Sequence, residues 1–387
     1  MKILISGLFG VANFGDELFS KVISEELKDR GYDDLFVFTY DDSITKKNVT
    51  GKYTVFPAFS FYSSTILKNI RTMRKIDLTL IGGGGLFNQV FFFQTIPNYS
   101  APALLALLFG KQYAIHGIEI GSIKSPFLKS LTQFVFKNAS YVMYRDQKSF
   151  DRALAKTENH FIGKDLSHSF LNRYFGKSRI SIENGLLVIN LQHALKYKEE
   201  EVLGLIDQLK DRVGSIKIVV VSKEEAVDAT VFASKIAFSS AISVDYFEDI
   251  DTNLSVLASA DILITEKFHF TLAGFHSQKE QYVISRTTKV REFVKDCQLN
   301  AESGVEQLAE GIYLFKPSES ARSGYSAKLA SDTMSYFDSI PASVQKKRKN
   351  SLGIKTRALL FLLQSFVLCI YHRAKSTGPY EIEPETL

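Results

Sequence analysis

The chain has 387 residues, of which 45% are hydrophobic and 23% charged, the balance of an ordinary globular protein. This composition excludes a disordered, collagen-like or disulfide-stapled chain, and the length favours two domains. Lysine and arginine number 47 against 42 acidic residues, but eight of these cations lie in residues 340–380, which contain no acid. The remainder has 39 cations against 42 acids, a net charge of −3, which argues against a broad nucleic-acid-binding surface.

Cysteine usage and hydropathy narrow the cellular location. The two cysteines, Cys297 and Cys369, have no metal-type spacing around them, and the segment after Met1 is too short for the core of a signal peptide. The longest apolar run, residues 358–371, falls short of the roughly 20 residues that span a bilayer. We therefore expect a cytoplasmic, reducing location.

The first half alternates short apolar strands with helical patterns. We expect strands at Lys2–Ser6, Asp34–Thr39, Asp77–Ile81, Gln112–His116 and Ser140–Tyr144, and helices at Gly15–Arg30, Ala101–Phe109 and Pro126–Lys137. Strands that are apolar throughout, separated by helices, indicate a parallel sheet that is covered on both faces. Residues 1–176 are therefore predicted to form a doubly wound α/β domain.

A second α/β series follows, which predicts a similar domain over residues 185–330. Its expected strands are Gly185–Leu191, Ser215–Val221, Ala241–Val244, Asp261–Thr265 and Gln281–Ser285, and its expected helices are Glu199–Arg212, Ala226–Phe238, Thr252–Ser259, one opening near His269, and two more up to Phe315. We expect two Rossmann-like domains facing a cleft, followed by a basic, apolar-centred tail at 340–387. Ligands of such sheets bind at the carboxyl ends of the strands.

The first loop that could bind a ligand or take part in a reaction runs from Gly7 to Glu17 and includes Asn13 and Asp16. Its glycines permit tight turns, and the following helix presents N–H groups to an anion. The spacing is not G-x-G-x-x-G, which argues against a bound dinucleotide. Asp16 and Glu17 are also explained as first-turn acids that complement the helix dipole.

Two further glycine-rich segments follow predicted strands in the first half. The first contains four consecutive glycines, Gly82–Gly85, and indicates either close approach of a ligand or a tight turn packed on a helix. The second, Gly117–Ser122, places the carboxylate of Glu119 beside flexible backbone.

The fourth segment, Thr265–Thr271, places Lys267, Phe268 and His269 at a predicted strand-to-helix junction. A histidine beside a cation and a helix start suits anion binding and proton transfer. Arg145 supplies a cation from the first domain, although a salt bridge with Asp146 or the next helix explains it equally. The remaining histidines are taken as structural: His116, His160, His168, His193, His276 and His372.

Taken together, these segments resemble the polysaccharide pyruvyl transferase family over roughly residues 3 to 300. The matching elements are Asn13–Glu17, Gly82–Leu86, Gly117–Gly121, Tyr144–Asp146 with Ser149, Ala260–Asp261, Lys267–His269 and Lys289 within Thr288–Phe293. The resemblance implies a glycosyltransferase-B-like fold and transfer of pyruvate from phosphoenolpyruvate, as co-substrate, to a sugar diol. The family usually has arginine where this chain has Lys267, and lysine lacks the planar fork that grips a carboxylate or phosphate.

The resemblance also assigns roles to residues. His269 is expected to be the general acid or base; the donor contacts are Arg145, Lys267, Phe268 and Lys289; the acceptor contacts are Asn13, Asp16, Glu17, Gly83, Gly84 and Glu119. No cofactor is required by the sequence and no metal-ligand cluster is visible, while a divalent ion bridging the phosphate stays open. The acceptor is expected to be a polysaccharide or a lipid-linked precursor of its repeat unit.

The tail offers two interpretations. Its apolar run between basic flanks suits an interfacial helix on an anionic membrane, which would place the protein on the inner face of the cytoplasmic membrane. The alternative is a closing helix packed across the domains. Two other functions stay open: a sugar-nucleotide-dependent glycosyltransferase of the same fold, and a non-catalytic, membrane-associated scaffold of a glycan assembly complex.

Overall fold

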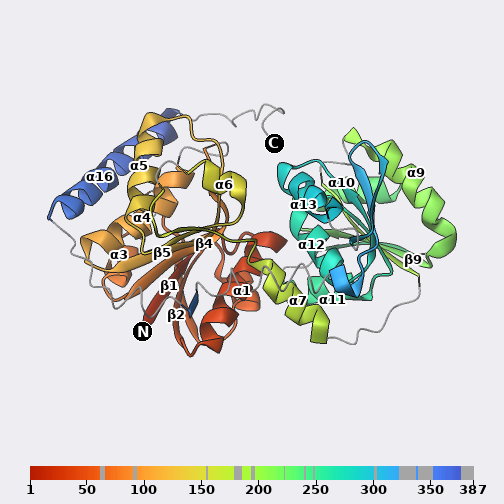
Figure 1. Cartoon of the computed structure of the whole chain (residues 1–387), viewed down its shortest axis with the longest axis horizontal. Coiled ribbons are helices and arrows are strands. Elements are labelled where there is room, and N and C mark those ends of the chain that lie inside the picture. Colours follow the sequence, from red (N-terminus) through yellow and green to blue (C-terminus); the bar gives the residue numbers. More distant parts are fainter. Residues whose placement is uncertain are drawn as a thin grey trace. The chain divides into compact units, whose positions relative to one another are not determined.

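A computed structural model describes most of the chain as two compact units (Figure 1). The described residues are 1–61, 66–89, 94–153, 156–177, 185–192, 197–221, 223–238, 241–246, 249–299, 303–321, 337–338 and 352–375. Unit 1 comprises Met1–Val11, Phe19–Leu166 and Asp332–Leu387; unit 2 comprises Ala12–Leu18 and Ser167–Ser331. The unit boundaries differ from the expected domain boundaries: residues 12–18 and 167–176, which were expected in the first domain, belong to unit 2, and the expected tail belongs to unit 1.

Unit 1 contains a seven-stranded sheet of order β3-β2-β1-β4-β5-β6-β7, in which every pair is parallel. The strands are β1 (Lys2–Ser6), β2 (Asp34–Thr39), β3 (Tyr53–Pro57), β4 (Leu78–Phe87), β5 (Gln112–Ile120), β6 (Val142–Tyr144) and β7 (His160–Ile162). The strand order reverses at β1, as in a doubly wound fold. The predicted Rossmann-like architecture of the first domain is confirmed.

Helices connect these strands, and one of them carries no charge on any side. The helices are α1 (Phe14–Asp29), α2 (Asp42–Asn48), α3 (Ile66–Met73), α4 (Thr95–Leu108), α5 (Pro126–Lys137), α6 (Gln147–Asp151) and, from the C-terminal segment, α16 (Leu352–Lys375). Helix α4 has no charged residue and is buried along nearly its whole length. It packs against β4 and β5 and also against α16, which covers it (Figure 1).

Unit 2 repeats the architecture with a sheet of order β10-β9-β8-β11-β12-β14-β13. Its strands are β8 (Leu186–Asn190), β9 (Ser215–Val220), β10 (Ile242–Tyr246), β11 (Ile262–Thr265), β12 (Glu280–Ile284), β13 (Val305–Ala309) and β14 (Ile312–Phe315). Its helices are α7 (Ser167–Lys177), α9 (Glu199–Leu209), the short 3₁₀ helix η1 (Lys210–Arg212), α10 (Lys223–Ala233), α11 (Ile250–Ser259), α12 (Phe268–His276) and α13 (Thr288–Gln298). The five strands from β8 to β12 are parallel, which confirms the second Rossmann-like domain.

One predicted helix of unit 2 is wrong. The second of the two helices expected before Phe315 is an antiparallel hairpin of β13 and β14, and β14 also pairs with β12. Gly311 lies between the two hairpin strands with a φ of +72°, a left-handed conformation that glycine adopts without strain. The turn at this glycine favours the hairpin over a helix.

The two glycine-rich segments of unit 1 belong to strands rather than loops. Gly82–Phe87 continues β4, and Gly117–Ile120 continues β5. A Cβ on Gly82 would lie 2.1 Å from the carbonyl oxygen of His116, and one on Gly83, at φ +83°, would lie 2.8 Å from Phe19. These glycines therefore allow β4, β5 and α1 to pack closely, which is a structural explanation for the glycine run.

The expected tail is only partly described. Residues 339–351, with Lys346, Lys347, Arg348 and Lys349, and residues 376–387 lie outside the described residues, as does His193. Phe337 and Asp338 pack on unit 1, where Asp338 accepts a hydrogen bond of 2.8 Å from Arg30 and the Phe337 ring lies 4.4 Å from that of His116. These two residues precede the tail, and the described part of the tail, α16, packs against α4 of unit 1.

His116 is a buried, neutral imidazole in the core of unit 1. Its Nδ1 lies 3.1 Å from the hydroxyl of Tyr141, and the side chain is inaccessible to solvent. Burial lowers the pKa of His116 to about 3, with a smaller contribution from the charge of Arg30.

We predict that this burial makes the fold acid-sensitive well above the native pKa of His116. The unfolded chain binds a proton at His116 below its ordinary pKa of about 6.5, whereas the native state does not. Stability should therefore fall as the pH decreases, by about 1 kcal/mol between pH 6.5 and 5.5 from this group. Urea unfolding of the parent and of His116→Gln should show a smaller decrease for the variant; equal decreases would contradict the prediction.

Candidate functional site

Three neighbouring parallel strands of unit 2 end at the same edge of the sheet. Asn190 of β8 pairs in register with Thr265 of β11, and Thr265 pairs with Val283 of β12. Glu266 follows directly after β11, and Arg286 is the second residue after β12. The polar side chains that follow these strands are therefore neighbours at the carboxyl edge, where such sheets bind ligands.

Glu266 is a buried carboxylate at this edge. Only 2% of it is exposed, and it accepts a hydrogen bond of 2.9 Å from the backbone N–H of Gln192. The guanidinium of Arg286 lies 3.9 Å from Oε1 of Glu266 and stacks over the ring of Tyr197 at 5.0 Å. This pairing holds a cation in place after β12.

Lys267 lies at the N-cap position of α12, where its side chain makes no capping hydrogen bond. Its Nζ instead donates to Oε1 of Glu225 at 2.8 Å. Burial lowers the pKa of Lys267 and outweighs the opposing attraction of Glu225 and Glu266. An added anion at this position would stabilise the protonated ammonium and raise its pKa again.

His269, in the first turn of α12, packs against the first turn of α1. A Cβ on Gly15 would lie 2.1 Å from Nδ1 of His269, so only glycine leaves room for the imidazole there. The ring of Phe14 lies 4.5 Å from that of Phe270, between the same two helices. The structure therefore brings the Asn13–Glu17 segment and the Lys267–His269 segment together within unit 2.

The polar residues of the Asn13–Glu17 segment have structural contacts of their own. Oδ1 of Asn13 accepts a hydrogen bond of 3.1 Å from the N–H of Gly15, which caps α1. Asp16 is half-buried and Glu17 is 1% exposed, and both stand in the first turn of α1. Their position also suits the helix dipole, as expected for first-turn acids.

Phe268 and Lys289, both expected to be donor contacts, lie in unit 2. The ring of Phe268 lies 5.1 Å from that of His269 and 6.2 Å from that of Phe293 on α13. Lys289 is half-buried in the first turn of α13, which Thr287 caps through a hydrogen bond of 3.4 Å from the N–H of Val290. Phe268 thus links the first turn of α12 to α13.

Arg145, in unit 1, is surrounded by carboxylates. Its guanidinium lies 2.5 Å from Glu119, 3.6 Å from Asp146 and 3.7 Å from Asp165, and the side chain is 5% exposed. Burial acts to lower the pKa of Arg145, but the attraction of Glu119, Asp165 and Asp146 outweighs it and raises the pKa. The sequence left open whether Arg145 contacts a ligand or forms an intramolecular salt bridge, and the structure contains such salt bridges.

The residues after Arg145 serve the fold. Asp146 caps α6 by accepting a hydrogen bond of 2.6 Å from the N–H of Ser149. The hydroxyl of Ser149 in turn accepts a hydrogen bond of 3.2 Å from the N–H of Ile120. The Tyr144–Asp146 motif with Ser149 therefore fixes the end of β5, where Glu119 is located.

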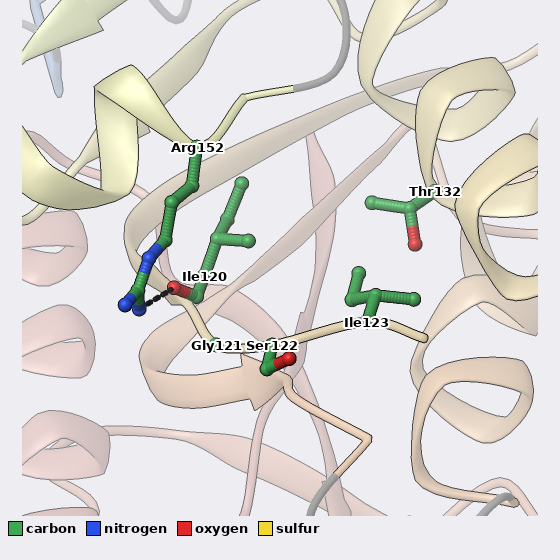
Figure 2. Close-up of a pocket in the computed structure, with 6 residues that line it drawn as sticks. All are labelled: Ile120, Gly121, Ser122, Ile123, Thr132 and Arg152. Atoms are coloured by element: carbon green, nitrogen blue, oxygen red, sulfur yellow. Dashed lines mark hydrogen bonds between the residues drawn. The ribbon is translucent and has the colours of Figure 1, made fainter. Parts of the chain in front are cut away.

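A small cavity of about 260 Å³ opens at this end of β5 (Figure 2). Its lining consists of Ile120, Gly121, Ser122, Ile123, Thr132 and Arg152. Arg152 donates a hydrogen bond of 3.3 Å to the carbonyl oxygen of Ile120, and Figure 2 shows its guanidinium beside that oxygen. Two of its lining residues are isoleucines, and the guanidinium of Arg152 already donates to a backbone carbonyl. This cavity is therefore a weaker candidate for a ligand site than the carboxyl edge of the sheet in unit 2.

Sequence reasoning singled out Lys267 and His269 but not the residues around them. Glu266, Glu225, Asn190 and Arg286 were not singled out, although Asn190 and Arg286 stand at or just after the ends of predicted strands. Asn190 is inaccessible to solvent and donates a hydrogen bond of 2.8 Å to the carbonyl of Val219. Among the residues that the structure describes, no group of three or more His, Cys, Asp or Glu side chains is arranged to hold a metal ion.

Two Rossmann-like domains define an α/β protein with a glycosyltransferase-B-like fold, and a histidine and a lysine stand at a helix start on the carboxyl edge of the second domain. The model of the polysaccharide pyruvyl transferase family matches residues 13–288. The chain therefore belongs to the polysaccharide pyruvyl transferase family. This match begins at the Asn13 segment and includes His269, and no curated protein matches the chain significantly.

Solved structures with the same fold are distant in sequence. A putative UDP-N-acetylglucosamine 2-epimerase from Listeria monocytogenes has 11% identity and a TM-score of 0.53, with 98% of each chain covered. MnaA of S. aureus, solved with UDP, has 11% identity and a TM-score of 0.51, covering 99% of this chain and 100% of its own. UDP-N-acetylglucosamine 2-epimerase from Rickettsia bellii has 10% identity and a TM-score of 0.51, covering 98% and 100%. At such identities the likeness shows the fold alone.

The contact between Gly15 and His269 generates a prediction. Gly15→Ala should displace the imidazole, because the new Cβ would overlap Nδ1, while alanine suits the helical backbone of α1. Because His269 is the expected general acid or base, we expect its displacement to lower turnover by about tenfold or more while the thermal transition changes little. Enzyme assays, thermal unfolding and the imidazole NMR signals of His269 would measure this. An unmoved His269 signal with full activity would contradict it.

Proposed function

We propose that this protein transfers the pyruvyl group of phosphoenolpyruvate to two hydroxyls of a sugar, forming a cyclic ketal and releasing phosphate. The observation that carries the proposal is the placement of His269 beside Lys267 in the first turn of α12, at the carboxyl edge of unit 2. This arrangement joins an imidazole, which can give or accept a proton, to a cation and a helix start that favour an anion.

The donor is a small, multiply charged anion, and the carboxyl edge of unit 2 offers cations for it. Lys267 and Arg286 are each held by a glutamate, Glu225 at 2.8 Å and Glu266 at 3.9 Å. Lys289 adds a third cation from the first turn of α13. In the proposal these cations contact the carboxylate and phosphate of the donor, and Phe268 lies against its apolar methylene group.

Ketal formation needs one proton donor and two hydroxyl nucleophiles. In the proposal His269 protonates the methylene carbon of phosphoenolpyruvate, so that C2 acquires positive character and the first sugar hydroxyl attacks it. The second hydroxyl then displaces phosphate at C2. One hydroxyl proton replaces the proton that His269 gave, and the other leaves with the phosphate. The products are the pyruvate ketal and inorganic phosphate.

The residues predicted for the acceptor lie in both units. Asn13, Asp16 and Glu17 adjoin His269 within unit 2, whereas Gly83, Gly84 and Glu119 belong to unit 1. In the proposal Asp16, which is partly exposed in the segment that adjoins His269, accepts a hydrogen bond from a sugar hydroxyl. Arg145, in unit 1, holds Glu119 and is not assigned as a donor contact, because three carboxylates already surround it.

The first test is the product itself. The purified protein with phosphoenolpyruvate and a panel of sugar acceptors should release phosphate in step with an acceptor mass gain of one pyruvate ketal. Transfer from UDP-sugars without turnover of phosphoenolpyruvate would assign the glycosyltransferase function, and no turnover with either donor would favour the scaffold.

We predict that His269→Ala lowers ketal formation by about a hundredfold or more, since general acid catalysis contributes at least that much. The protein should keep its thermal transition, because His269 is only half-buried. His372→Ala, a histidine on α16 outside the candidate site, is the matched control and should keep full activity. Substantial residual turnover in His269→Ala would refute the acid assignment.

We also predict an alkaline limit to donor binding that depends on Lys267. Burial lowers the pKa of Lys267, so its charge is lost at a lower pH than that of an ordinary lysine. The KM for phosphoenolpyruvate should rise with pH by up to about tenfold per unit above that pKa. Lys267→Arg should remove this rise, because arginine stays protonated.

Lys267→Met should raise KM at every pH and is the control for loss of the charge itself. A KM for the parent that is flat to high pH, or the same alkaline rise in Lys267→Arg, would show that another group sets the limit.

A further inference from the structure

Helix α16 has the length and composition of a membrane helix. It spans 24 residues, Leu352–Lys375, which is longer than its central apolar run. The stretch Leu352–His372 is long and apolar enough to cross a membrane by these criteria, yet only 28% of its most apolar window is buried. Its remaining apolar surface therefore needs an explanation.

One face of α16 is part of the core of unit 1. Ala358, Phe361, Ser365 and Cys369 are buried, and their spacing of three or four residues places them on one side of the helix. The ring of Phe361 lies 5.2 Å from that of Phe134 on α5. This inner face also covers α4, which has no charged residue on any side.

The opposite face is apolar and exposed. We call it the outer face of α16, and it consists of Leu352, Leu359, Leu360, Leu363, Phe366, Val367, Ile370 and Tyr371. At about 100° per residue these positions fall in an arc of about 140°, in which Thr356 is the only polar side chain. Exposed fractions of 55% for Leu363 and 63% for Val367 show how far this face stands open.

The charges around the outer face have one sign. Lys355 and Arg357 lie in its first turns, and the sequence adds Arg373 and Lys375 in the last turn. Helices α3, α4, α5 and α16 contain no acidic residue, whereas α3 and α5 contribute Lys68, Arg71, Lys129 and Lys137. An apolar stripe on a helix whose charged residues are all basic, packed against the acid-free helices α4 and α5, complements a surface of anionic lipid.

We propose that the outer face of α16 binds an anionic lipid bilayer, with the helix lying in the plane of the membrane and its inner face still packed on unit 1. Two other occupants fit the observations less well. A helix that crossed the bilayer would have to withdraw its inner face from the core and expose the apolar surface of α4. A second copy of the chain would bring the same cations together without acids to pair them.

The experiment is the binding of the full chain to vesicles. Vesicles of phosphatidylcholine, alone or mixed with phosphatidylglycerol, are sedimented with the protein in the absence of any donor or acceptor. The unaltered chain should bind the anionic vesicles and not the neutral ones. Because no turnover is measured, this result is independent of the proposed pyruvyl transfer.

Point substitutions are preferable to deletion of the tail, since deletion would uncover α4. The double variant Leu363→Gln/Val367→Gln should bind anionic vesicles about tenfold or more weakly, because two apolar anchors are lost. The matched control, Val227→Gln/Leu299→Gln, changes one valine and one leucine that are 66% and 89% exposed in unit 2, and it should bind as the parent does. Both variants should keep the thermal transition of the parent.

The cations are tested by Lys355→Gln/Arg373→Gln, which should weaken binding to anionic vesicles and reduce its dependence on salt. Several outcomes would overturn the proposal. The first two are no vesicle binding by the parent and undiminished binding by Leu363→Gln/Val367→Gln. Resistance of the bound protein to extraction by alkaline carbonate would indicate a spanning helix. A doubled mass in light scattering that Leu363→Gln/Val367→Gln abolishes would assign the outer face to a second copy.

Discussion

The candidate site depends on the close approach of the first turn of α1 to the first turn of α12. The imidazole of His269 occupies the space where any residue but glycine would place a Cβ at position 15, and the Phe14–Phe270 contact closes the same interface. The sequence motif around Gly15 therefore has a steric reason that is separate from ligand binding. The same approach explains why Ala12–Leu18 belongs to unit 2 while the rest of α1 belongs to unit 1. A segment that sequence order assigns to the first domain thus helps to position the imidazole of the second.

Charge is arranged differently at the two predicted cation sites. Arg145 is surrounded by Glu119, Asp146 and Asp165, so its charge already has partners before any ligand arrives. Lys267 has one close partner, Glu225, and burial still lowers its pKa. A cation that is under-compensated in a buried place gains more from an added anion than one that is fully paired. The electrostatics therefore favour the carboxyl edge of unit 2 for an anionic donor, although both cations belong to motifs of the family.

Much of the fold could be predicted from the sequence because parallel strands are apolar on both faces and helices show a regular period. Lys2–Ser6, Asp34–Thr39 and Pro126–Lys137 have the predicted bounds. The glycine segments were wrongly predicted as loops, because glycine in a sequence usually indicates a loop. Only the structure shows that a neighbouring strand, here the carbonyl of His116 beside Gly82, leaves no room for a side chain. The partners of Lys267 and Arg286 were missed for a related reason. Glu225 and Glu266 are ordinary acids in the sequence, and only the pairing of elements far apart in the chain gives them a role.

The tail shows how a choice posed by the sequence can be a false one. An apolar helix with basic flanks was expected either to bind a membrane or to pack on the rest of the protein. This choice assumes that both contacts would need the same residues. A helix has two sides, and α16 uses Ala358, Phe361, Ser365 and Cys369 for the core while Leu359, Leu363 and Val367 face outward. The inward packing also changes what the outward face can do. A helix whose other side is held by α4 and α5 presents its apolar stripe at a fixed orientation, so less conformational entropy is lost on binding a surface than if the tail were a free segment. Of the basic residues that first set 340–380 apart from the acidic remainder, Lys355 and Arg357 thus lie on a structured helix of unit 1.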